Sequence, residues 1–151
     1  MVDATDLKLL RVLQHEPTLS VAALGERIGL THTPCWRRLK RLEADGVIRG
    51  RRLLLDAEAL GLPITAFCFI RLDRHDKATM EAFERAAREH PNIVQCYTMS
   101  GDQDYVLRIV VPSIGAFERL VKEDLLSLPS VGQMSSSFAL SEIKNTTELP
   151  I

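Results

Sequence analysis

The sequence has few cysteines and no long apolar run, and each shortage excludes a class of protein. The three cysteines, Cys35, Cys68 and Cys96, are odd in number and widely spaced, unlike the paired cysteines of secreted disulfide scaffolds. No stretch approaches the roughly 18 uninterrupted apolar residues that cross a bilayer. Residues 1–10 have neither the basic segment nor the apolar run of a signal peptide. We therefore expect a reduced, cytoplasmic protein with no membrane partner.

The net charge is also small, only −1, but the charges are unevenly distributed along the chain. Residues 1–52 have ten Lys/Arg and six Asp/Glu, a balance of +4, whereas residues 53–151 have nine and fourteen, a balance of −5. Seven of the ten basic residues lie between Arg37 and Arg52. A phosphate-binding surface requires such a local positive potential. A solvated basic helix has the same composition, so the charge alone does not decide.

Two short helices are predicted at the start of the chain. Apolar residues recur every third position in residues 5–14, which places them on one helical face, and Asp3 can cap this helix. A second helix is expected at residues 21–28. Ser20 is its natural N-cap, and Gly29 is its C-terminal stop.

A third helix is predicted to follow, with one apolar and one basic face. Either Thr31 or Thr33 can be its N-cap, and it continues to about residue 45. At about 100° per residue, three apolar residues share one face and the basic residues occupy the opposite one. Two helices joined by a short turn predict a helix-turn-helix, in which the second helix lies in the major groove of DNA. The apolar face consists of Cys35, Leu39 and Leu42.

The residues expected to contact DNA lie on this third helix and on the basic segment after it. Arginine can read guanine with two hydrogen bonds, whereas lysine and the trailing arginines suit phosphates. The pattern does not decide which residue makes which contact. Trp36, the only tryptophan, lies at the edge of the apolar face, where packing is its commoner role. The DNA-binding candidates are Thr31, Thr33, Trp36, Arg37, Arg38, Lys40, Arg41, Arg49 and Arg51.

The rest of the chain predicts an α+β fold. Residues 47–55 are rich in branched residues and arginine, which indicates a strand or a small wing leading into a connector. The order βαββαβ then predicts a four-stranded antiparallel sheet with both helices on one face, the ferredoxin-like arrangement. The elements are expected at 64–72 (strand), 76–90 (helix), 93–100 (strand), 105–111 (strand), 113–128 (helix) and 133–143 (strand).

This order divides the chain into three parts. They are a helix-turn-helix DNA-binding domain at residues 1–50, a wing or linker at 51–62 that would complete a winged helix-turn-helix, and a βαββαβ domain for effector binding and oligomerisation at 63–151. The uncovered face of the sheet must be buried, because residues 66–70 are apolar on both sides of their strand. Self-association is the simplest way to bury it.

The turn between the second and third strands, residues 101–104, combines a glycine with two aspartates. A glycine-led turn presents backbone N–H groups, and the aspartates add carboxylates. An amino acid has both charges, so one such turn could meet both of its ends. The same residues also suit an ordinary polar hairpin turn. Two carboxylates are a sparse site for Mg²⁺ or Ca²⁺, and no metal is expected.

Three segments of the chain resemble the Lrp/AsnC family of leucine-responsive and asparagine-responsive regulators. They are residues 19–48, the motif Met99-Ser-Gly-Asp-Gln-Asp-Tyr105, and residues 135–147, which have the family's order and spacing. The sequence Thr33-Pro-Cys-Trp and the serine-rich last segment resemble the branch that includes cysteine-responsive (DecR-like) regulators. One departure is Arg51, where many members have an aromatic residue in the wing.

The resemblance implies a sequence-specific DNA-binding transcriptional regulator that responds to a small amino acid. Family members bind effectors around this turn at the interface between dimers, and one subunit's last strand helps to line the site. Homodimers that assemble into octamers are therefore expected, presenting several helix-turn-helix units to double-stranded DNA. Alternation along the last strand keeps its three serines from facing the ligand together. The effector-binding candidates are Met99, Gly101, Asp102, Asp104, Tyr105, Ser135, Ser136 and Ser137.

Other classes of function have less support. The sequence has no nucleophile with a base and no phosphate loop, so we expect neither an enzyme nor a cofactor. His32 and Cys35 lie three residues apart, but a zinc site needs a second pair of ligands. The main alternative is an architectural protein that bends DNA without an effector. Only coupling between an amino acid and DNA binding separates the two hypotheses.

Overall fold

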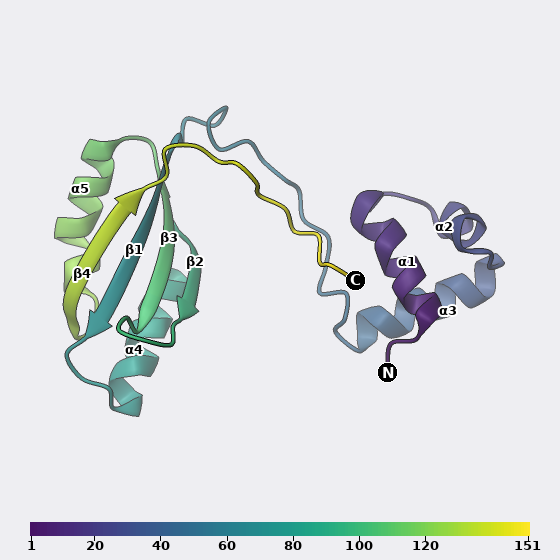
Figure 1. Cartoon of the computed structure of the whole chain (residues 1–151), viewed down its shortest axis with the longest axis horizontal. Coiled ribbons are helices and arrows are strands. Elements are labelled where there is room, and N and C mark those ends of the chain that lie inside the picture. Colours follow the sequence, from purple (N-terminus) through teal and green to yellow (C-terminus); the bar gives the residue numbers. More distant parts are fainter. The chain divides into compact units, whose positions relative to one another are not determined.

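The computed structural model describes all residues from Met1 to Ile151, and Figure 1 shows its elements. The chain forms two compact units, residues 1–54 together with 144–151, and residues 55–143. Residues 63–151 were expected to form one domain, whereas residues 144–151 pack with the first unit in the structure. None of the helices combines the length and apolar character needed to cross a membrane.

Three helices form the first unit, and local capping signals set the ends of the first two. Asp3 and Asp6 each accept the other's backbone N–H in a capping box, at 2.8 and 3.0 Å. Ser20 Oγ accepts from the backbone N–H of Ala23 at 3.2 Å, and Gly29 ends the second helix with a φ of 74°. Both helices are confirmed to within one residue at each end. The bounds are α1 Ala4–His15, α2 Val21–Ile28 and α3 His32–Ala44.

The N-cap of α3 is Thr31, one of the two residues predicted for this position, although its side chain makes no capping hydrogen bond. Pro34 is therefore the third helical residue. It costs no helical hydrogen bond there, because the first turn of a helix has unpaired N–H groups anyway. Asp45 follows the helix, and Gly46 after it has a φ of 71°.

The core of the first unit holds α3 against α2. The buried side chains are Leu9, Leu24, Cys35, Leu39 and Leu42, and they include the apolar face predicted for α3. Gly25 also belongs to this contact, because a Cβ added there would lie 2.6 Å from the carbonyl oxygen of Leu30. Any larger residue would push the turn away from α2. The close approach of the turn at Leu30 to α2 thus depends on a glycine.

Residues 47–55, expected to form a strand or a small wing, form no strand; no strand occurs between α3 and residue 64. Ile48 packs on the core, and its N–H donates to the Leu42 carbonyl at 3.0 Å. The three leucines that follow, residues 53–55, are exposed. A strand requires a neighbouring backbone to bond with, and this segment has none within its unit.

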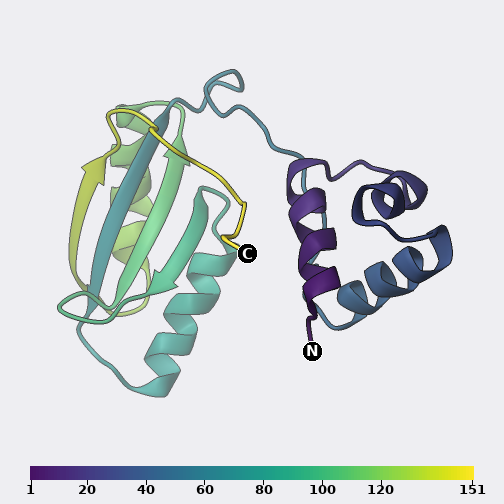
Figure 2. The same cartoon turned by 45° about the vertical axis from the view of Figure 1, so that its right-hand side comes forward.

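The second unit is a four-stranded antiparallel sheet in the order β2-β3-β1-β4, with α4 and α5 on one face. Figure 2 shows the same layers from another side. The predicted ferredoxin-like βαββαβ fold is therefore confirmed. The bounds are β1 Ile64–Leu72, α4 Lys77–Glu89, β2 Ile93–Thr98, β3 Tyr105–Val111, α5 Ile114–Glu123, a 3₁₀ turn η1 at Leu125–Ser127, and β4 Val131–Phe138.

Four predicted ends in this unit were wrong by two residues or more, and the first is that of β2, which ends at Thr98 and not at residue 100. The last helix stops at Glu123 and gives way to the 3₁₀ turn, instead of continuing to residue 128. The last strand begins at Val131 and ends at Phe138, five residues before the predicted end. Phe138 pairs with Ala66, close to the start of β1, so β4 has little partner strand left beyond this point.

The two faces of the sheet differ sharply in burial. Residues 66, 68 and 70 of β1 are fully buried between the sheet and the helices, where they meet Phe83 of α4 and Phe117 of α5. Phe67 and Phe69 point to the other face, which no helix covers, and Phe67 is 36% exposed. The sheet therefore has a helix-covered face and an open face that is partly apolar.

Candidate DNA-contacting helix and effector turn

Helix α3 presents a basic exposed surface. Arg37, Lys40 and Arg41 are exposed, and so is Trp36 at 46%. Arg38 is half-buried. Thr31 and Thr33 are also exposed at the start of the helix. The basic face predicted for α3 is thus present as one surface, but its basic residues bind different partners.

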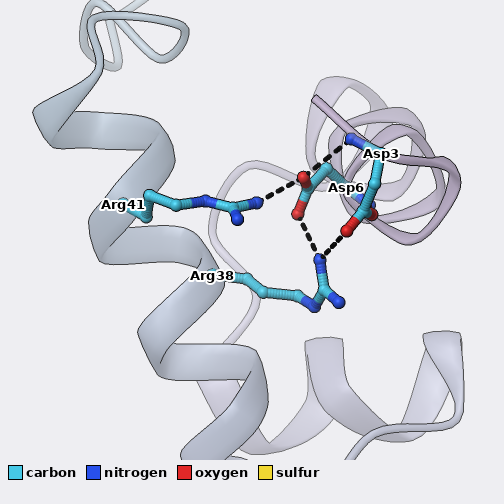
Figure 3. A network of polar contacts seen from close by, with 4 residues as sticks. All are labelled: Asp3, Asp6, Arg38 and Arg41. Atoms are coloured by element: carbon cyan, nitrogen blue, oxygen red, sulfur yellow. Dashed lines mark hydrogen bonds and ion pairs between the residues drawn. The ribbon is translucent and has the colours of Figure 1, made fainter. Parts of the chain in front are cut away.

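Two of these arginines point toward α1, as Figure 3 shows. Arg38 Nη1 lies 2.6 Å from Asp3 Oδ2 and 2.8 Å from Asp6 Oδ1. Arg41 Nη2 forms an ion pair with Asp6 Oδ2. Asp6 itself is fully buried, so both of its oxygens are used inside the protein.

The carboxylates of this network are held in their charged form. Burial of Asp6 opposes its ionisation, but the backbone N–H of Asp3 and the guanidinium groups of Arg38 and Arg41 outweigh burial, so its pKa is lowered. The hydrogen bonds from Arg38 and from the Asp6 backbone lower the pKa of Asp3 to about 2. The network is therefore a set of full charges at neutral pH.

The remaining basic candidates are less constrained. Lys40 Nζ pairs with Glu43 Oε2 at 2.7 Å on the helix surface. Arg37 forms no ion pair or hydrogen bond and lines a hollow beside Arg38, Arg41 and Pro34. After the helix, Arg49 and Arg51 are exposed and have no partner. Of the three arginines on α3, only Arg37 has a free guanidinium group.

The turn between β2 and β3 is anchored at its base. Gly101 has a φ of 108°, a conformation that favours glycine. The backbone N–H of Met99 donates to the Asp104 carbonyl at 2.8 Å, which closes the turn. The Asp104 carboxylate accepts from the backbone N–H of Leu72 at 2.7 Å and contacts His75 Nε2 at 2.9 Å. The Leu72 hydrogen bond is the main reason that the pKa of Asp104 is lowered.

The eight effector candidates do not all lie in one place. Gly101 and Asp102 are exposed in the turn, and Met99 is 42% exposed beside it. Tyr105 is buried, with its hydroxyl donating to Glu84 Oε1 at 2.9 Å. Burial and the Glu84 carboxylate raise the pKa of this phenol. The Tyr105 side chain therefore belongs to the helix-covered side.

The three serines of β4 alternate between the faces of the sheet. Ser135 and Ser137 pair with Phe69 and Phe67 on the open face, whereas Ser136 pairs with Cys68 on the helix side. In the sheet order, β1 separates β4 from β3 and its turn. Within one copy of the chain, the serines and the turn are thus not adjacent.

Two structural contributors were absent from the sequence-based candidates. Asp6 shares one face of α1 with Leu9 and Leu13, and a carboxylate on a core-facing helical stripe signals a buried charged partner. His75 precedes α4 and meets the turn only because β1 brings it to Asp104. No short-range pattern predicts that second contact.

Comparisons with known proteins agree along the whole chain. Residues 2–49 match the family described as "Winged helix-turn-helix DNA-binding", and residues 65–149 match "Lrp/AsnC ligand binding domain". The chain is 42% identical over 151 residues to the "DNA-binding transcriptional activator DecR" of Escherichia coli K12, covering 100% of this chain and 99% of that protein. It is 40% identical over 150 residues to the "Glutamate uptake regulatory protein" of Zymomonas mobilis, covering 99% and 91%.

Solved structures show the same architecture. An AsnC family transcriptional regulator from Agrobacterium tumefaciens has a TM-score of 0.92 at 44% identity, covering 98% of this chain and 96% of that one. A transcriptional regulator from Neisseria meningitidis, solved as an L-Met complex, has a TM-score of 0.92 at 39% identity, covering 99% and 97%.

Proposed function

Since this chain belongs to the Lrp/AsnC family and is a DNA-binding transcriptional regulator with an amino-acid ligand-binding domain, we propose that a small amino acid bound at the β2–β3 turn controls its binding to DNA. The observation that carries this proposal is the anchored turn. Asp104 fixes the base of the turn to the end of β1, while Gly101 and Asp102 remain exposed. The L-Met complex of the Neisseria relative adds support for an amino-acid ligand.

The turn offers partners for both charges of an amino acid. Asp102 is exposed and has no ion pair, so its carboxylate is available to an ammonium group. Backbone N–H groups near Gly101 can receive a carboxylate. Asp104 already binds Leu72 and His75, so we assign it the role of holding the turn rather than touching the ligand.

A second copy of the chain is part of this proposal. Within one copy β1 lies between the turn and β4, so we assign the contact of Ser135 or Ser137 with a ligand at the turn to another subunit. The open face, with Phe67 36% and Tyr97 56% exposed, is the surface that we assign to the homodimer. Further assembly of dimers into octamers would bring turns and last strands of different dimers together.

Regulation then follows from differential binding. An amino acid changes DNA binding only if it binds one arrangement of subunits more tightly than another. On the DNA side, we assign base contacts to Thr33 and Arg37, and phosphate contacts to Lys40, Arg49 and Arg51. Because the relatives named above are bacterial, we also propose that the protein acts in the cytoplasm, where a bacterial chromosome lies.

A thermal-shift screen against the twenty amino acids tests the effector proposal. A ligand at about 100 times its dissociation constant stabilises a protein by roughly 2.7 kcal/mol. We expect a selective shift with the wild-type protein, loss of the shift in Asp102→Asn, and retention of it in Glu89→Gln, which neutralises an exposed acid on α4.

An effector-independent architectural protein would give a different result. None of the twenty amino acids would stabilise it, and its affinity for duplex DNA would be the same with and without them. That outcome, with wild-type DNA binding as the positive control, would reject the effector proposal.

A further inference from the structure

Asp6 is the only charged side chain that is fully buried in the structure. It lies on α1 and faces α3, where it accepts from Arg38 at Oδ1 and from Arg41 and the Asp3 backbone at Oδ2. A buried carboxylate is costly unless all of its oxygens are satisfied. Here they are satisfied by two side chains of the helix expected to contact DNA.

The ion pairs change what those two arginines offer to DNA. Arg38 and Arg41 keep part of their surface exposed, 29% and 44% of their side chains. Their guanidinium groups are nevertheless bound to carboxylates, which compete with phosphate oxygens for the same donors. Arg37, which directly precedes Arg38 in the sequence, has no such partner.

We propose that Asp6 is a positioning residue that determines which arginine of α3 is available to bind DNA. Its carboxylate binds the guanidinium groups of Arg38 and Arg41, so they do not bind phosphates, whereas Arg37 remains free to contact a base edge. This inference rests on the proposed function in one respect, the assignment of α3 as the DNA-contacting helix. The consequence is higher sequence specificity. Each arginine that does not contact a phosphate lowers the affinity for DNA of any sequence, while the affinity that comes from base contacts is retained.

The direct test compares wild-type protein with Asp6→Asn, which keeps the shape of the side chain and removes its charge. The probes are a mixed-sequence 30-base-pair duplex and a duplex that the wild-type protein selects from a random library. We expect tighter binding of the mixed-sequence duplex, by about three- to tenfold at low salt. The slope of log K against log salt concentration should steepen by about 0.9 for each arginine released to a phosphate. The preference for the selected duplex should fall correspondingly.

A purely structural role for Asp6 would not steepen the salt slope, and matched variants separate the two roles. Glu26→Gln removes one exposed negative charge from α2 without releasing an arginine, so it should leave the slope near the wild-type value. Adding Arg38→Gln and Arg41→Gln to Asp6→Asn should return the slope to wild type. Circular dichroism and size-exclusion chromatography report whether each variant is folded.

Asp3→Asn keeps the proposal testable even if Asp6→Asn does not fold. Asp3 is exposed and its one ion pair is with Arg38, so its substitution should steepen the slope in the same direction and by less than Asp6→Asn would. A wild-type slope in a folded Asp6→Asn protein, or in Asp3→Asn where Asp6→Asn is unfolded, would overturn the proposal.

Arg37→Ala distinguishes a failure of this proposal from a failure of the proposed function. If Arg37→Ala binds the selected duplex as wild type does, then α3 is not the reading helix and the role of Asp6 falls with it. If Arg37→Ala loses the selected duplex while Asp6→Asn binds like wild type, only the role of Asp6 is wrong.

Discussion

The side-chain amide of Gln14 forms two hydrogen bonds with the backbone of Leu149, 135 residues away in the chain. The Leu149 N–H donates to Gln14 Oε1 at 2.6 Å, and Gln14 Nε2 donates to the Leu149 carbonyl at 3.2 Å. Arg11 Nε adds a bond to the Ile151 carbonyl at 2.7 Å. Residues 144–151 are thus bound to α1, because the Gln14 amide pairs with both the N–H and the carbonyl of Leu149, as a neighbouring β-strand backbone would.

Gln14→Ala should release this segment. The bonds are solvent-exposed, so we expect a loss of only about 1 kcal/mol in the free energy of unfolding, with faster amide hydrogen exchange confined to residues 144–151. Lys8→Ala, an exposed substitution on the same helix, is the control. Unchanged exchange at Leu149 would show that the pairing contributes nothing in solution.

Acid should destabilise the first unit through Asp3 and Asp6. Both have a lowered pKa in the folded protein, so their stabilisation is complete above the unfolded value of about 4. It is lost as the pH falls through the folded values, which for Asp3 is about 2. Urea unfolding followed by helical circular dichroism should therefore be insensitive to pH above about 5 and weaken between about 4 and 2.

The double variant Asp3→Asn/Asp6→Asn should flatten this acid dependence, because it removes both titrating groups. An equally steep loss of stability in the double variant would assign the effect to carboxylates elsewhere in the chain.

The two aspartates of the β2–β3 turn should respond differently to substitution. Asp104→Ala leaves the partly buried N–H of Leu72 without its acceptor, and we expect it to cost about 1 to 3 kcal/mol of stability together with the ligand response. Asp102→Asn should change stability by less than about 0.5 kcal/mol and abolish only the ligand response. Melting temperatures with and without the amino acid found in the screen measure both effects. Equal destabilisation by both substitutions would contradict the division of roles.

A charge on the open face of the sheet should disrupt the homodimer. Phe67 is partly exposed at the centre of that face, on β1, so Phe67→Lys should place an unpaired charge in the proposed interface and shift the protein toward monomers. Sedimentation velocity measures the distribution. Leu126→Lys alters an exposed apolar residue of the 3₁₀ turn, 56% exposed, and should leave the assembly intact. Dissociation by Leu126→Lys alone would place the interface on the helix-covered side.

Much of the candidate site followed from short-range pattern. The unequal charge and the apolar stripe of Cys35, Leu39 and Leu42 placed α3 and its basic face. The turn at residues 101–104 was found from its glycine and aspartates. These signals depend on residues close together in the sequence, so they can be recognised without the structure.

The hydrogen-bond and ion-pair partners of those residues could not be predicted from the sequence. No spacing links Asp6 to Arg38, or Asp104 to Leu72, because each pair lies 32 residues apart and meets through packing. The end of β4 likewise depended on where β1 begins, which is a property of the pairing between two strands.

The sequence by itself determined the first two helices with their caps, the strands β1 and β3, the order of elements, and the identity of the basic and acidic candidates. Each of these depends on local backbone preference or on the periodicity of apolar residues. Only the tertiary structure decided that Arg38 and Arg41 are bound while Arg37 is free, and that Asp104 is a structural anchor. Whether a charged side chain is available depends on which opposite charge the fold brings within hydrogen-bonding distance, and that is a non-local property.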